Sequence, residues 1–219
     1  MIKFMTSEPR IKQALQWWFY RQFWKLFLES EKVRDDLLQE SFTIRRNLDL
    51  LVMDQLSLSV TEIQSYINKI DNFHHSLVQL SDRLCPISIQ DSLPLCIEFL
   101  LEPWINSYPH LYFQVNMPIS WRIEEPECSW IILRVLEELL RITLPETEIL
   151  LPIYIHVTLK QIGSIALLAV KISYPDLSTF IFYSHLPELE YIYDIFKLLI
   201  SGKCFYFHKN LISNWHFYW

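Results

Sequence analysis

Glycine is scarce in this chain of 219 residues, which contains Gly163 and Gly202 and no others. At the usual share of ~7%, a chain of this length carries roughly 15. Glycine allows φ angles above zero and lets a main chain come close to a phosphate group. Two glycines are too few to form the glycine-rich loops that hold nucleotides, and we do not expect phosphate chemistry based on such loops.

Basic blocks and closely paired cysteines are also missing. The net charge is −6 and the pI is about 5.6, so nucleic acid is not expected as the main partner. The four cysteines form no C-x-x-C pair, which is typical of reduced thiols in a cytoplasmic protein. We expect a cytoplasmic protein that holds no metal and no cofactor.

Long uncharged apolar runs are absent as well. No run of 18 such residues occurs, so the sequence predicts no transmembrane helix. The opening residues MIKFMTSEPR are too polar for a signal peptide. Apolar side chains are plentiful, at 51% of the chain, and aromatic ones reach 15%. This composition, with a modest net charge, indicates a large buried core and excludes a disordered chain.

Two long helices are predicted before Pro86, over residues 11–51 and 60–84. Both carry apolar residues at heptad-like spacing. These are Phe19, Phe23, Leu26, Val33, Leu37, Ile44, Leu48 and Leu51 in the first helix, and Ile63, Ile67, Ile70, Phe73, Leu77, Leu80 and Leu84 in the second. One helix pair cannot bury two such stripes, so we expect a homodimer in which two hairpins form a four-helix bundle.

The pattern after residue 87 predicts an α/β layer. Helices are expected at 92–107, 126–142 and 188–200, and strands at 111–117, 153–159, 165–173, 204–207 and 215–219. The predicted fold is α+β, with a helical hairpin followed by an α/β sandwich. The expected divisions are an aromatic helical extension (1–30), a dimerising hairpin (31–87) and an α/β domain (88–219).

Several stretches resemble the sensor histidine kinases that pair with NarL/LuxR-like response regulators. Residues 33–45 resemble the family's L-H-D-x-x-x-Q helix, with Arg34 in place of the phospho-accepting histidine, Asp35 at the acid and Gln39 at the glutamine. Residues 80–93 resemble the end of its second helix, 132–142 its R-I-x-Q-E-A-L-x-N helix, and 198–203 the step before its last hairpin. The resemblance implies a dimerising hairpin and a kinase-like ATPase sandwich.

The sequence departs from the family pattern at the residues that would bind the nucleotide and accept its phosphoryl group. Ile142 falls where an asparagine would hold magnesium, and 173–176 falls on the D-x-G segment but has no glycine. The lid over 177–189 has no glycine either, and Arg34 cannot accept a phosphoryl group. The resemblance therefore implies an inactive pseudokinase. Its degenerate nucleotide site would comprise Glu138, Ile142, Ser173 and Asp176, filled by Tyr174, Pro175 and residues 180–183.

The partner-binding face could survive these losses. In the family, the acid and amide at Asp35 and Gln39 act on the phospho-aspartate of the response regulator. The resemblance implies a partner-binding face made of Arg34, Asp35, Leu38, Gln39 and Phe42. The chain would bind a receiver domain, or an active kinase, as a scaffold or sequestering regulator. Alternatively, Asp35 and Gln39 would act as a phosphatase pair, with Gln39 orienting a water.

The segment 17–24 holds six aromatic residues in eight positions. A buried or interface helix explains this composition, and so does a helix that lies on a membrane surface. Both interpretations stay open, and the second makes membrane-surface interaction a further candidate function.

Overall fold

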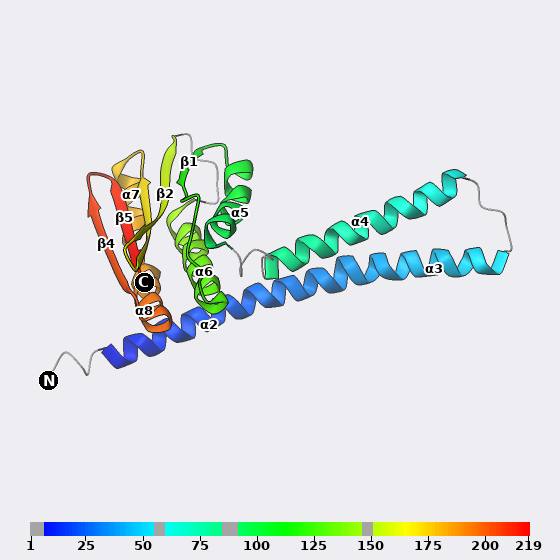
Figure 1. Ribbon diagram of the computed structural model, residues 1–219, viewed down its shortest axis with the longest axis horizontal. Coiled ribbons are helices and arrows are strands. Elements are labelled where there is room, and N and C mark those ends of the chain that lie inside the picture. The colour runs from blue at the N-terminus through cyan, green and yellow to red at the C-terminus, as the bar shows by residue number, and fades with distance from the viewer. Residues whose placement is uncertain (1–6, 55–59, 85–91, 146–150) are drawn as a thin grey trace. The chain divides into compact units, whose positions relative to one another are not determined.

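The computed structural model describes residues 7–54, 60–84, 92–145 and 151–219 (Figure 1). The chain forms two compact units. One combines residues 1–18 with 88–219, and the other comprises 19–87. The units divide inside the first helix, between Trp18 and Phe19, and again between residues 87 and 88.

The helical unit contains the second of the two long helices that the sequence predicts and most of the first, from Phe19 onward. The first run consists of α2 (Ser7–Lys32), a π-helical turn η1 (Val33–Leu37) and α3 (Leu38–Asp54). The second is α4 (Val60–Leu84), which has the predicted bounds. In η1 the N–H of Leu38 donates to the carbonyl of Val33, five residues back. The sequence pattern did not predict this extra residue in the turn.

The other unit contains a mixed five-stranded sheet in the order β1-β2-β3-β5-β4. Its elements are α5 (Leu93–Ser107), β1 (Leu111–Asn116), α6 (Pro126–Thr143), β2 (Ile153–Ile162), β3 (Ile165–Ser173), α7 (Leu177–Ser184), α8 (Glu188–Ile200), β4 (Lys203–Lys209) and β5 (Ile212–Tyr218). β1 and β2 are parallel, and the other pairs are antiparallel. The predicted α+β class is confirmed.

Local sequence explains where these elements start and turn. The Ser92 hydroxyl accepts the N–H of Leu95 at the start of α5, and Pro126 occupies the first turn of α6. The β2–β3 hairpin turns at Gly163, whose φ of 63° favours glycine. The side-chain amide of Gln161 donates to the Gly163 carbonyl at 3.0 Å and closes the turn.

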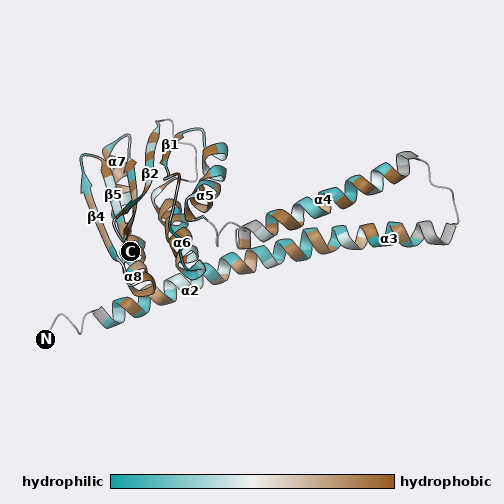
Figure 2. Cartoon of the chain, viewed as in Figure 1, coloured by the Kyte–Doolittle hydropathy of each residue, from teal (hydrophilic) through white to brown (hydrophobic). Residues whose placement is uncertain are grey.

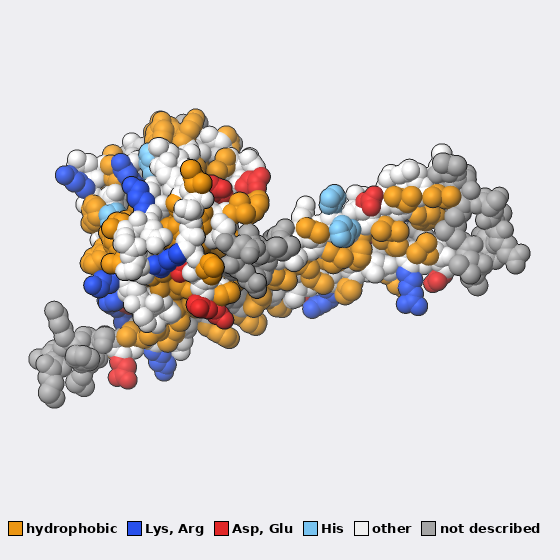
Figure 3. Space-filling model, viewed as in Figure 1, with side chains coloured by type: hydrophobic (Ala, Val, Ile, Leu, Met, Phe, Trp, Pro, Cys, Tyr) orange, Lys and Arg blue, Asp and Glu red, His pale blue; other side chains and the backbone are white. Residues whose placement is uncertain are grey.

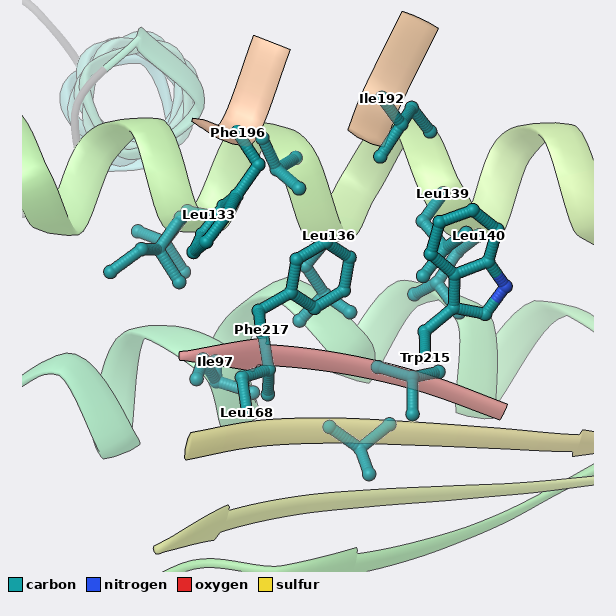
Figure 4. Close-up of a cluster of buried hydrophobic side chains, with 14 of the residues drawn as sticks. Ile97, Leu133, Leu136, Leu139, Leu140, Leu168, Ile192, Phe196, Trp215 and Phe217 are labelled. Atoms are coloured by element: carbon teal, nitrogen blue, oxygen red, sulfur yellow. The ribbon is translucent and has the colours of Figure 1, made fainter. Parts of the chain in front are cut away.

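The core lies between one face of the sheet and the helices α5, α6 and α8. Leu136 and Leu140 of α6 point toward Trp215 and Phe217 of β5, with Phe196 of α8 beside them (Figure 4). All five side chains are fully buried. The rings of Phe196 and Phe217 meet nearly edge to face, with centroids 4.9 Å apart. This packing uses one face of every strand and leaves the opposite face of the sheet for other roles.

The first half of α2 belongs to the same core. Ala14 and Trp18 are buried, and the ring of Trp17 lies 5.8 Å from that of Tyr191 on α8. The guanidinium of Arg10 contacts both carboxylate oxygens of Asp194, at 2.7 and 3.0 Å. Residues that the sequence assigned to a separate extension therefore pack against α8.

Candidate functional site

The expected partner-binding residues lie around the π-helical turn. Leu38 is 60% exposed and Phe42 is 67% exposed. Arg34, Asp35 and Gln39 are exposed around them. A π-helical turn inside an α-helix is rare and is found frequently at functional sites. The structure thus places these five residues on one short stretch of helix surface that mixes apolar and polar groups.

Arg34, the cation of this stretch, forms a weak ion pair within its own helix. The guanidinium of Arg34 lies 2.6 Å from the carboxylate of Glu31, one turn earlier. An exposed pair at this spacing contributes only a few tenths of a kcal/mol, roughly, so a stronger acidic partner can displace it. The hydroxyl of Thr43 donates to the backbone carbonyl of Gln39 at 2.9 Å, and this contact does not involve the side-chain amide of Gln39.

A second exposed surface runs along α4, next to α3 within the helical unit. Five apolar residues at heptad spacing are 41–46% exposed, namely Ile63, Ile67, Ile70, Leu77 and Leu84, whereas Phe73 and Leu80 of the predicted stripe are half-buried. Hydrophobic and polar turns alternate along α4 (Figure 2), and hydrophobic side chains gather over both helices of the hairpin (Figure 3). This unburied stripe matches the seam by which helices associate.

The aromatic segment 17–24 divides between two environments. Trp17 and Trp18 pack into the core as described, whereas the rings that follow are exposed. The ring of Phe23 stacks on those of Phe19 and Phe27, with centroids 6.4 and 6.2 Å away. The exposed rings fit either an interface helix or a surface helix. Among the described residues, no helix has the length and apolarity needed to cross a membrane.

The two α6 positions of the expected degenerate nucleotide site differ in burial, because Glu138 is buried and Ile142 is half-buried. Glu137 and Glu138 are both buried. The burial has a reason, because Glu137 contacts the guanidinium groups of Arg134 at 2.8 Å and Arg141 at 3.3 Å. Burial lowers the pKa of Arg134, and the carboxylates of Glu137 and Glu138 partly oppose that shift.

Aromatic packing joins the end of α6 to the end of β3. The hydroxyl of Tyr174 donates to the carbonyl of Thr143 at 3.1 Å, and both residues are buried. The Tyr174 ring lies parallel to that of Tyr183 on α7, with centroids 6.3 Å apart, and meets the edge of Phe180. Burial raises the pKa of Tyr174, so it stays a neutral donor. Thr143 follows Ile142 and Tyr174 follows Ser173 in the chain, so these contacts bring the end of α6 close to the end of β3.

Asp176 has a structural role at this place. It is the N-cap of α7, where its carboxylate accepts the N–H of Thr179 at 2.8 Å, the hydroxyl of Thr179 at 2.9 Å and the hydroxyl of Ser178. These hydrogen bonds lower the pKa of Asp176 to about 2. The sequence treated 177–189 as a lid without glycine, and the structure forms the helix α7 in its first half. The Asp-Leu-Ser-Thr start was the signal for a cap.

Histidine and cysteine residues complete the set of reactive groups. His185 and His208 lie with ring centroids 5.7 Å apart, and Nδ1 of His208 is 3.0 Å from the hydroxyl of Ser213. Burial and the nearby His185 lower the pKa of His208. Burial raises the pKa of the Cys204 thiol to about 12, so it is unreactive. Within the described ranges, no group of three or more metal-ligating residues occurs.

Comparisons with known proteins find likeness in structure alone. No family model and no curated protein matches the chain. The Acinetobacter baumannii histidine kinase AdeS is 12% identical, covering 84% of this chain and 95% of its own, with a TM-score of 0.39. The histidine kinase domain of the Erythrobacter litoralis blue-light activated kinase EL346 is 10% identical, covering 95% of this chain and 94% of its own, with a TM-score of 0.45.

A third similar structure is the histidine kinase ThkA in complex with the response regulator protein TrrA. It is 16% identical, covering 91% of this chain and 63% of its own, with a TM-score of 0.44. At these identities and scores the likeness is loose. Assigning an activity therefore requires the residues of this chain itself.

Proposed function

We propose that this chain is a pseudokinase of two-component signalling, which binds the receiver domain of a NarL-like response regulator as a scaffold or sequestering partner. The exposed Leu38 and Phe42 beside the π-helical turn carry this proposal. They offer apolar contact area in the helix stretch whose sequence resembles the family's receiver-binding motif. Arg34 supplies a fixed cation there, which suits the acidic phosphorylation pocket of a receiver domain.

The residues near the end of α6 do not fit magnesium and ATP. Mg²⁺ requires oxygen ligands, and Ile142 offers only carbon atoms at the position where the resembling motif has asparagine. Asp176 is engaged as the cap of α7, and Tyr174 is packed between Thr143 and Tyr183. Phosphoryl transfer depends on positioning and charge stabilisation, which these apolar and engaged groups do not provide. We therefore propose no kinase activity for this chain.

The α4 stripe supports self-association as part of the same proposal. A heptad seam with five residues that stay 41–46% exposed in one copy would be covered in a dimer whose two hairpins form a four-helix bundle. Such a bundle would present two copies of the Arg34–Phe42 stretch. A mixed dimer with an active kinase would use the same stripe.

Calorimetric titration of the full chain with a purified NarL-type receiver domain tests the binding. We expect saturable binding that weakens about tenfold or more in a Leu38→Ala/Phe42→Ala variant, because both side chains are exposed and large. A Leu95→Ala/Phe99→Ala variant is the matched control, since these α5 side chains are also exposed. Absence of binding, or equal loss in both variants, contradicts the proposed surface.

A thermal-shift experiment with ATP and magnesium tests the loss of the nucleotide site. A ligand that binds the native state must raise its melting temperature. We expect no rise at millimolar ATP. A clear rise, or autophosphorylation, would contradict the pseudokinase assignment while leaving receiver binding to be judged by calorimetry.

A phosphatase is the second candidate, because Asp35 and Gln39 are both exposed on the same helix stretch. The amide of Gln39 would orient a water toward the phospho-aspartate of the bound receiver domain, and Asp35 would help to position it. Phosphate release from a phosphorylated receiver domain decides between the two candidates. A rate that the chain accelerates, and that falls in Gln39→Ala, supports the phosphatase. If the rate of phosphate release is unchanged in Gln39→Ala, receiver binding without catalysis remains as the candidate function.

A further inference from the structure

The sheet face opposite the helices carries its own pattern of side chains. Each strand alternates, so the neighbours of the buried core residues point to this open face. Strand pairing sets them in rows across the sheet. One such row runs through His156 of β2, Lys171 of β3, Asn214 of β5 and Phe207 of β4. The open face is therefore a continuous surface that five strands build in register.

The charge of this face is opposite to that of the whole chain. The chain has 25 Asp and Glu residues, yet no position in the five described strands is acidic. Four exposed lysines point from the open face: Lys160, Lys171, Lys203 and Lys209. Burial lowers the pKa of His216, so this residue adds no charge near neutral pH. The open face is therefore cationic within an acidic protein.

Aromatic rings lie among these cations, most regularly on β4. Lys203, Phe205, Phe207 and Lys209 share one side of this strand because they alternate. Phe205 is 53% exposed and Phe207 is 48% exposed. Successive residues on one side of a strand lie ~6.7 Å apart. The Phe205 ring meets that of Tyr218 at 5.9 Å, nearly edge to face, so a neighbouring strand supports it.

We propose that this open face binds single-stranded nucleic acid. Bases of a single strand stack on exposed rings, and lysines contact the phosphates. Other sheet-based RNA-binding domains use a similar alternation of a cation and two rings on one strand. Here Phe205 and Phe207 would stack two successive bases, with Lys203 and Lys209 contacting phosphates at either end. A duplex keeps its bases stacked inside, so it cannot use these rings.

This proposal does not depend on receiver binding, because the open face belongs to the α/β unit and Arg34–Phe42 to the helical unit. It also differs from the expectation of no nucleic acid, which rested on the charge of the whole chain. A cationic face with exposed rings also suits an anionic membrane or an acidic protein. These two partners are therefore included as alternative outcomes of the test.

Fluorescence anisotropy of labelled RNA and DNA single strands of about twelve nucleotides, titrated with the full chain, tests the proposal. We expect binding of at least one of them, and weaker binding of a duplex of the same sequence. Phe205→Ala/Phe207→Ala should weaken single-strand binding by about tenfold or more, since each stacked base contributes that order. Phe99→Ala on α5, where the phenylalanine is 55% exposed, is the matched control and should bind normally.

The lysines are tested through the dependence of affinity on salt. Lys203→Gln/Lys209→Gln should reduce the slope of log K against log salt by about 1.4, because each phosphate of a single strand that a lysine neutralises adds about 0.7 to that slope. Lys12→Gln, an exposed lysine on α2, should leave the slope unchanged. Circular dichroism and melting curves establish that each variant is folded.

Three results would overturn the proposal. The first is no anisotropy change with RNA or DNA single strands at protein concentrations up to about 100 micromolar, the weak end of non-specific binding. The second is binding of anionic phosphatidylserine vesicles or polyglutamate without binding of single strands. The third is single-strand binding that the folded Phe205→Ala/Phe207→Ala and Lys203→Gln/Lys209→Gln variants retain in full.

Discussion

At the scale of single residues, the two glycines have different tasks. Gly163 has a φ of 63° and open space around its α-carbon. Gly202 has no room, because a β-carbon there would lie against the carbonyl oxygen of Tyr218 and 2.7 Å from Cε1 of Phe196. The backbone conformation therefore requires glycine at position 163, and close packing requires it at position 202.

Gly202→Ala should consequently destabilise the fold more than Gly163→Ala. Overpacking against backbone and a buried ring costs about 1–3 kcal/mol. In Gly163→Ala, left-handed strain of about 1–2 kcal/mol is offset by about 0.4–1 kcal/mol from the less flexible unfolded chain. Urea unfolding of the two variants measures both costs. Equal stability of the variants would show that the backbone at Tyr218 and the ring of Phe196 move easily to admit the added methyl group.

Asp176 connects pH to the stability of α7. Its pKa is lowered to about 2 by hydrogen bonds from Ser178 and Thr179, so the carboxylate form is favoured in the folded state. Its stabilising effect is complete above about pH 4, where an unfolded aspartate is ionised, and is lost as the pH falls through the folded pKa. Asp176→Ala should lower the melting temperature at neutral pH, and this difference should shrink toward about pH 2.

Asp176→Asn is the control for this prediction, because asparagine also caps helices but does not titrate. Its melting temperature should lie above that of Asp176→Ala, and the difference between these two variants should not depend on this titration. A melting-temperature loss in Asp176→Ala that stays constant down to about pH 2 would contradict the assignment of the cap to the carboxylate form.

At the scale of elements, the docking of α2 onto α8 depends on few polar contacts. Arg10 reaches both oxygens of Asp194, and the Asp194 side chain is only 10% exposed. Arg10 itself is half exposed, so we expect a coupling free energy of about 1 kcal/mol or less. A double-mutant cycle with Arg10→Ala and Asp194→Ala, followed by urea unfolding, measures it. A coupling near zero would mean that Ala14 and Trp18 hold α2 without this ion pair.

The sequence predicted elements with strong periodicity and missed those that depend on a local exception. α4 has its predicted bounds because a long amphipathic stripe ends just before Pro86. The turn η1 was missed, since nothing in Val-Arg-Asp-Asp-Leu distinguishes a π-helical turn from an α-helical one. α7 was missed because its segment was compared with a family lid, although Asp176 and Thr179 mark a helix start.

The candidate sites show the same difference. The partner-binding face around Arg34 stays a prediction, and the structure shows that Leu38 and Phe42 in it are exposed. The burial of Glu137 was not predictable from adjacent acids, because it depends on Arg134 and Arg141 closing over it. The sequence predicted that Tyr174 fills this region, but its hydrogen bond to the carbonyl of Thr143 depends on long-range packing that local sequence does not show.

At the scale of the whole molecule, net charge conceals a separation of charges. The chain carries −6 overall, whereas its described strands contain lysine and histidine without any acid. A function inferred from the net charge of the whole chain therefore does not describe the open face of the sheet. Strand pairing brings Lys171 and Lys203 from distant sequence positions onto one surface, which a search for basic runs cannot detect.

Self-association should depend on the α4 stripe. We expect the full chain to be a dimer by size-exclusion chromatography with light scattering, and Ile67→Glu to be a monomer. A glutamate at a heptad seam position would bury a charge between helices, which costs several kcal/mol by rough account unless the charge is paired. Ile67 is 45% exposed in the single chain, so the substitution should leave the folded monomer intact.

Ile181→Glu on α7 is the matched control, because Ile181 is also about half exposed but lies outside the hairpin. This variant should stay dimeric. If Ile67→Glu is dimeric too, the copies associate through another surface, for which the stacked rings of Phe19, Phe23 and Phe27 are the next to substitute. If the unaltered chain is monomeric at high concentration, the exposed α4 stripe instead requires a different protein to cover it, as in a mixed dimer with an active kinase.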